Sequence, residues 1–178
     1  AHAAYLLRLL PRLQSTAAAG ERTARHTIDV QFESGRRAWA WSIEHGQVDA
    51  LKRSSATLLE HFDYRGRFEE GLAFLRTAIE SQPVQADAKL RSLLLARISH
   101  LEYRLNRFAE AESTARQALE ATRRNRDSAT RRQALNVVAT CALQLGRLDD
   151  ARRYFKQALD SESLEDQAHR TAVTLDHL

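Results

Sequence analysis

Apolar side chains recur along this chain at helical spacing, in three stretches that share one register. Steps of three and four residues place such side chains on one face of a helix. The members are Phe68, Gly71, Leu75, Ala78 and Ile79 in the first stretch, Phe108, Ala111, Ala115, Ala118 and Leu119 in the second, and Leu148, Ala151, Phe155, Ala158 and Leu159 in the third. The pattern predicts three amphipathic helices with their phenylalanines in the core. A small residue at Gly71, Ala111 or Ala151 predicts a close helix crossing in each.

Each of these stretches follows a tight turn that a glycine or an asparagine marks. The turn residues are Gly66, Asn106 and Gly146, which lie 40 positions apart. Glycine and asparagine tolerate the left-handed backbone conformation that closes a helix. A further helical stretch precedes each turn, over residues 48–64, 85–105 and 128–145. The chain is therefore predicted to form antiparallel helix pairs at a constant period, which is typical of stacked helical repeats.

The repeat pattern predicts an all-α protein, a right-handed superhelix of helix hairpins. We expect a helical front segment over residues 1–46 that packs on three helix pairs within residues 47–162. The pairs are expected at residues 47–83, 85–124 and 127–162, with Asp127 as an N-cap. Residues 163–178 are expected to form a helix that caps the stack or begins a fourth pair. Composition agrees, because the 178 residues include only 2 prolines and 6 glycines.

The order of residues in each pair resembles the tetratricopeptide repeat. A small residue, an aromatic residue or leucine, an acidic residue, alanine and a closing Ala-Leu follow one another in that family. The first pair is the best copy, with Leu58, Leu59, Phe62, Gly66, Phe68, Gly71, Leu75, Ala78 and Pro83. The usual period is about 34 residues, so the longer period here implies longer helices. The resemblance implies a concave groove that binds a protein or peptide partner or a small anionic effector.

The front segment resembles a different known pattern. Glu33, Arg36, Ala38, Trp41 and Gly46 are similar to the segment that opens the helical sensor region of STAND-class bacterial transcriptional regulators, the MalT-like, AfsR-like and LuxR-family proteins. Ser34 and Gly35 depart from that pattern. The resemblance implies that an ATP-dependent switch and an output domain belong to a longer parent chain, whose other domains would be partners of this region. The alternatives are a structural or oligomerisation scaffold and, less favoured, a nucleic-acid-binding helical domain.

The sequence gives little indication of a catalytic, metal or cofactor site. There is no GxxxxGK[ST] or GxGxxG phosphate loop, and the seven histidines form no HExxH motif and no pair at ligand spacing. We expect no enzyme activity, no metal and no cofactor. The single cysteine, Cys141, lies among apolar residues and is expected to be buried and inert. No apolar run is long enough to cross a bilayer, so a cytoplasmic location is expected.

Charge marks two candidate surfaces. The net charge is +4, and five arginines gather around one predicted loop: Arg123, Arg124, Arg126, Arg131 and Arg132. This basic patch could contact phosphate, but it lacks the interleaved aromatic residues that stack on bases, so direct nucleic-acid binding is the less favoured interpretation. The second surface is the inner face of the first helices. Its candidate partner-binding residues are Arg53, Glu60, Tyr64, Arg97, His100, Tyr103, Arg104, Asn136 and Thr140.

Overall fold

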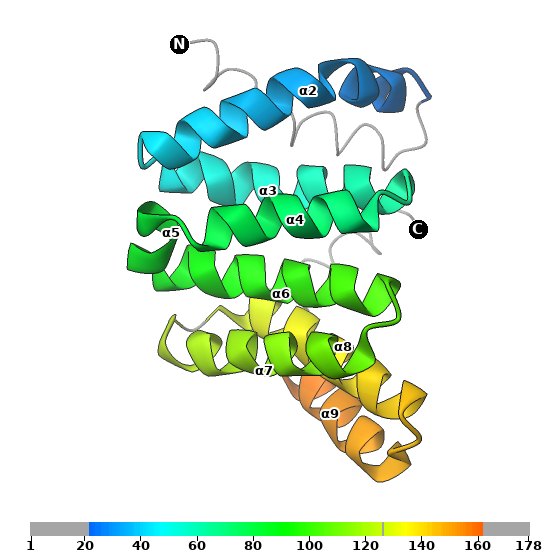
Figure 1. Cartoon of the computed structure of the whole chain (residues 1–178). Coiled ribbons are helices and arrows are strands. Elements are labelled where there is room, and N and C mark those ends of the chain that lie inside the picture. The colour runs from blue at the N-terminus through cyan, green and yellow to red at the C-terminus, as the bar shows by residue number, and fades with distance from the viewer. Residues whose placement is uncertain (1–21, 126, 162–178) are drawn as a thin grey trace, which may run out of the picture.

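The computed structural model describes residues 22–125 and 127–161, and this part of the chain is entirely helical apart from its turns. Its eight helices are α2 (Arg22–Glu44), α3 (Val48–Tyr64), α4 (Phe68–Ile79), α5 (Gln82–Ala86), α6 (Ala88–Arg104), α7 (Phe108–Asn125), α8 (Ser128–Gln144) and α9 (Leu148–Asp160). Figure 1 shows them stacked from α2 at one end to α9 at the other, with α8 and α9 turned relative to the helices before them. The fold is an α-solenoid of helix hairpins.

Four turns of one kind join the long helices. Gly46, Gly66, Asn106 and Gly146 all have positive φ, at 62°, 66°, 59° and 75°. In each turn the next residue donates its backbone N–H to a carbonyl five positions back, as Arg67 does to Phe62 at 2.9 Å. The prediction at Gly66, Asn106 and Gly146 is confirmed. The sequence analysis ends the front segment at Gly46 but does not count it with the three repeat turns, because it lies half a period before Gly66, between α2 and α3.

The helix predicted over residues 85–105 was placed wrongly at its start. It begins at Ala88, because the Asp87 carboxylate accepts the Leu90 backbone N–H at 2.7 Å and caps the helix there. The preceding residues form the short helix α5, which the sequence interpretation missed by treating Pro83 as the end of a pair. Proline is tolerated in a first helical turn, which is where Pro83 lies. The N-cap predicted at Asp127 is confirmed by its bond from the Thr130 N–H at 3.0 Å.

Aromatic side chains fill the space between α2, α3 and α4. Trp39 is 1% exposed and packs on Phe74 with ring centroids 5.7 Å apart. Trp41 is half-buried and stacks on His45 instead, as expected for two residues about 200° apart around a helix. Gly71 lies so close to α3 that a Cβ atom there would be 2.8 Å from Cγ of Phe62. The predicted close crossing at Gly71 is therefore confirmed.

The last helix departs from the predicted pattern. Ala151 and Ala158 of α9 are buried, but Phe155 is 36% exposed and Leu159 71% exposed. The prediction that Phe155 lies in the core is wrong. Its equivalent 40 residues earlier, Ala115, is buried because α8 packs over α7, whereas no helix within the described residues follows α9.

Candidate partner-binding face

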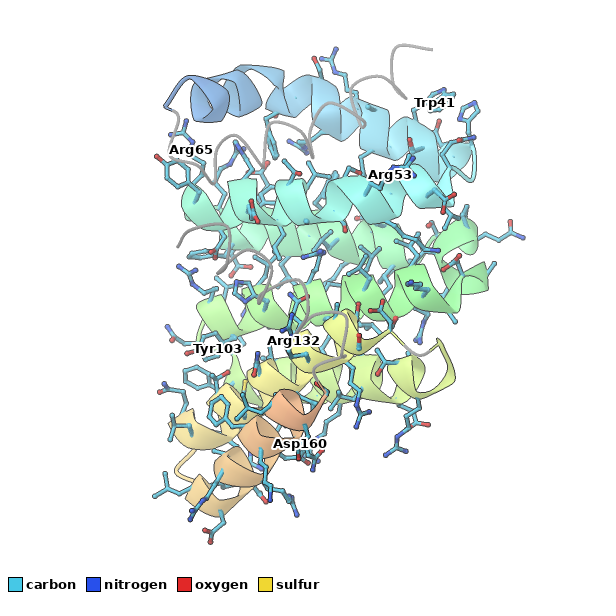
Figure 2. The ribbon with its side chains drawn as sticks, turned by 180° about the vertical axis from the view of Figure 1, so that it is seen from behind. Trp41, Arg53, Arg65, Tyr103, Arg132 and Asp160 are labelled. Carbon is cyan, nitrogen blue, oxygen red and sulfur yellow. The ribbon has the colours of Figure 1, made fainter. Side chains whose placement is uncertain are left out.

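One face of the stack is built from the first helix of each pair, α3, α6 and α8, and we call it the first-helix face. Figure 2 shows this side, with Arg53 on α3 and Arg132 on α8 labelled. Because the period is constant, equivalent residues line up across the helices. Glu60, His100 and Thr140 are one such row. Arg53, Glu60, Tyr64, Arg104 and Asn136 are exposed, and Arg97, His100, Tyr103 and Thr140 are half-buried.

Arg97 breaks the pattern of the repeat. Its equivalents, Thr57 and Val137, are both buried, so α6 carries a charge where the other first helices carry part of the core. The Arg97 Nε donates to the Ser55 hydroxyl at 3.2 Å. Burial lowers the pKa of Arg97 to about 10, although Glu60 and Asp127 act to raise it. The guanidinium is therefore cationic at neutral pH but has lost much of its water, which strengthens its attraction for an anion.

Arg97 lines a pocket of about 630 Å³ between α6, α8 and α9. Arg132, Gln133 and Asn136 of α8 provide polar lining beside it, and Leu93, Phe155 and Leu159 provide apolar lining. The pocket therefore combines basic, amide and apolar lining. The sequence interpretation found Arg97, Arg132 and Asn136 but missed the apolar wall, because it assigned the α9 residues to the core.

Arg104 has a different role from Arg97. Its guanidinium pairs with Asp63 of α3 and lies over the Phe68 ring, 4.5 Å from the centroid. The same Asp63 oxygen lies 3.5 Å from His100 Nε2. Arg104 and His100 therefore join α6 to the first helix pair. A second arginine pair crosses the same joint, where Arg107 contacts Glu69, and Arg147 contacts Glu112 at the joint between the second and third pairs.

The two tyrosine candidates also differ. Tyr103 packs on Phe108 with ring centroids 5.8 Å apart, beside a buried cluster that includes Ala111 and Val138. Tyr103 thus takes part in the packing between α6 and α7. Tyr64 is 63% exposed at the end of α3, with the Arg65 guanidinium 5.7 Å from its ring centroid.

The Thr140 hydroxyl donates to the Asn136 carbonyl at 2.9 Å, within its own helix.

The described members of the predicted basic patch, Arg123, Arg131 and Arg132, make different contacts. Arg132 lines the pocket, whereas Arg123 pairs with Glu120 at 2.8 Å on α7. Arg131 is half-buried. The side chains of Arg124 and Arg126 lie outside the described residues. The described members thus have different surroundings, and nothing in their arrangement favours a phosphate backbone over a protein.

Residues 22–125 and 127–161 hold no group of three or more histidine, cysteine, aspartate or glutamate side chains that could bind a metal ion. None of their helices has the length and apolar character needed to cross a membrane. Cys141 is buried, as predicted, and burial together with the nearby Glu112 raises the pKa of its thiol to about 11. The thiol is therefore protonated and unreactive at neutral pH.

Comparison with known proteins agrees with this architecture. The family model described as tetratricopeptide repeat matches residues 89–161, which are the second and third pairs and not the first pair that the sequence interpretation ranks best. The chain is similar to the crystal structure of BtubC (BKLC) from P. vanneervenii, with a TM-score of 0.58 and 21% identity over 75% of this chain. The likeness spans 58% of the BtubC chain, and at this identity it shows the fold alone.

No curated protein matches the chain significantly. Tetratricopeptide repeats generally mediate protein–protein interaction, through surfaces formed by stacked helix pairs. Residues 89–161 are similar to that repeat, and the described chain as a whole has the all-α solenoid fold that such repeats build.

Proposed function

We propose that the first-helix face recognises a protein partner through an acidic segment of that partner. The observation that carries this proposal is Arg97, a partly desolvated cation that lines an open pocket. Placing a charge where the other pairs bury Thr57 and Val137 costs stability, and an anionic ligand would compensate for that cost. The guanidinium presents its donors in a fixed fork that suits a carboxylate.

Two neighbouring features support a peptide over a small free anion. The pocket of about 630 Å³ is larger than a single carboxylate requires, and its apolar wall of Leu93, Phe155 and Leu159 suits a hydrophobic side chain. The amide side chains of Gln133 and Asn136 also line the pocket and can both donate and accept. A segment with a carboxylate close to a large apolar residue would use all three kinds of lining.

The test is a binding measurement on the full chain with fluorescein-labelled short peptides. The peptides share leucines and differ only in carrying glutamate, glutamine or lysine between them. The glutamate peptide is expected to bind best, and Arg97→Gln is expected to weaken it by about tenfold to a hundredfold, because hydrogen bonds to charged groups contribute about 1.5–3 kcal/mol.

The matched control is Arg91→Gln, which removes a half-buried arginine of the same helix that lines a different pocket. It should leave binding unchanged. Equal binding of the three peptides, or equal loss in the Arg91 and Arg97 variants, would refute recognition at Arg97. Retention of glutamate-peptide binding in both variants would refute it too, whereas no binding of any of the three peptides would favour a scaffold without a ligand on this face.

We further propose that this chain is the sensing region of a larger ATP-dependent bacterial transcription regulator that acts in the cytoplasm. The support is the resemblance of the front segment, at Glu33, Arg36, Ala38, Trp41 and Gly46. Arg36 there pairs with Glu70 of α4 at 3.1 Å, so the front helix is joined to the first pair. The test is the coding sequence of the parent: an ATPase module with a phosphate-binding glycine loop is expected, and a parent without one refutes this part of the proposal.

A further inference from the structure

Two departures from the repeat pattern contact each other across the first two helix pairs. Counted by the period of 40 residues, Ser55 of α3 takes the place that Leu95 and Leu135 have in α6 and α8. Both leucines are buried core residues, so α3 carries a hydroxyl where the other first helices carry apolar bulk. Arg97 is the corresponding departure on α6, and its Nε donates to the Ser55 hydroxyl at 3.2 Å. The two exceptions to the repeat therefore meet in one hydrogen bond.

The Ser55 hydroxyl is available to Arg97 only as an acceptor. Ser55 is fully buried, and its hydroxyl donates to the Lys52 carbonyl at 2.8 Å. A hydroxyl has one proton and two lone pairs, so this bond uses its single proton and leaves acceptor capacity for the Arg97 Nε–H. One donor of the Arg97 guanidinium thus has a fixed partner on the neighbouring helix.

This bond determines which edge of the guanidinium is left for a ligand. A guanidinium can hold a carboxylate through two parallel N–H bonds, either at the edge with Nε and one Nη or at the edge with both Nη atoms. Because Ser55 takes the Nε donor, the edge with both Nη atoms remains. Within the described residues Arg97 makes no further hydrogen bond or ion pair, and it lines the pocket of about 630 Å³.

We propose that Ser55 is a positioning residue for this pocket. By accepting from Nε, it holds the Arg97 guanidinium so that the two Nη groups receive one planar carboxylate of the partner. A guanidinium without this bond would lose rotamer freedom each time a ligand bound, and that loss lowers affinity. This role rests on the proposed function, and it adds a residue of the first pair to a pocket that α6, α8 and α9 line.

The first measurement needs no peptide. Exchange of the Arg97 Nε–H with water is followed by NMR in the full chain, with the signal assigned by its loss in Arg97→Gln. Ser55→Ala removes the acceptor and is expected to speed this exchange by about threefold to tenfold. Ser54→Ala is the matched control and should leave the exchange unchanged. Ser54 is also fully buried, but its hydroxyl donates to the Ala50 carbonyl at 2.7 Å, within its own helix.

The second measurement uses the fluorescein-labelled glutamate peptide. Ser55→Ala is expected to weaken its binding by about threefold to tenfold, because one hydrogen bond that positions Arg97 is lost. In the Arg97→Gln background Ser55→Ala should cause no further loss, since Ser55 acts through Arg97. Ser54→Ala should bind the peptide as the parent chain does.

Unchanged exchange or unchanged peptide binding in Ser55→Ala would overturn the positioning role, and so would equal effects of Ser54→Ala. Additive losses from Ser55→Ala and Arg97→Gln would overturn it as well, because Ser55 would then act on binding by another route. In each of these cases the selectivity for the glutamate peptide and its dependence on Arg97 can still hold. Equal binding of the three peptides by the parent chain would instead refute the proposed function, and with it the role of Ser55 in binding, even where the exchange responds to Ser55→Ala.

Discussion

Replacing Gly71 with alanine sets two known effects against each other. In an exposed helix interior, alanine is more stable than glycine by about 1 kcal/mol. At this position the added Cβ would lie 2.8 Å from Phe62 Cγ and 3.0 Å from two further Phe62 atoms. Phe62 is fully buried and packs on Phe32 and Phe74, so its ring cannot swing away. Overpacking of this kind costs about 1–3 kcal/mol. The cost of overpacking should exceed the gain in helix propensity. Gly71→Ala should therefore lower the free energy of unfolding by about 1 kcal/mol.

The assay is urea unfolding followed by circular dichroism at the helix band, with the thermal midpoint as a second measurement. A loss of about 1 kcal/mol lowers the midpoint of a chain this size by about 2–4 °C. Combining Gly71→Ala with Phe62→Leu should cost less than the sum of the two single changes, because the smaller side chain makes room for the methyl group. If Gly71→Ala is as stable as the parent or more so, or if the two changes are additive, the close approach of α4 to Phe62 does not exist as described.

Three further predictions concern a turn, a cap and a buried histidine. Asn106→Ala should cost about 1–2 kcal/mol in urea unfolding, whereas Asn106→Gly should be neutral, because Asn106 has φ 59°. Asp127→Ala should cost about 1 kcal/mol in the same assay by removing the cap of α8, and Asp127→Asn should cost less. Burial lowers the folded-state pKa of His61, so the unfolded chain takes up a proton first as the pH falls. The free energy of unfolding should therefore fall as the pH drops below about 6.5, and His61→Gln should reduce that dependence.

Most of the helix framework could be predicted from the sequence because it depends on local signals. Glycine or asparagine at Gly66, Asn106 and Gly146 marks the turns whatever packs around them. The helix predicted over residues 48–64 is observed as Val48–Tyr64. The prediction fails where one local signal fits two structures. Pro83 is such a case, because a proline can end one helix or start another.

The candidate site depends on contacts between pairs, which a single sequence does not display. Arg97 and Arg104 lie on the same helix and look alike as charges. Only the structure shows that Arg104 pairs with Asp63 while Arg97 lines an open pocket. One signal for Arg97 was available, since alignment at the 40-residue period places it beside Thr57 and Val137. The exposure of Phe155 could not be foreseen, because its spacing is that of a core residue.

The arginine pairs at the joints of the stack also bear on its mechanics. Arg36 with Glu70 joins the front helix α2 to the first pair, Arg107 with Glu69 joins the first pair to the second, and Arg147 with Glu112 joins the second pair to the third. Each of these arginines is partly exposed to solvent. Attraction between such charges weakens as salt screens it, whereas the apolar contacts beside them do not weaken in this way. The ion pairs therefore contribute less to each joint when the ionic strength rises, and the apolar contacts then provide a larger share of the attraction between neighbouring units of the stack.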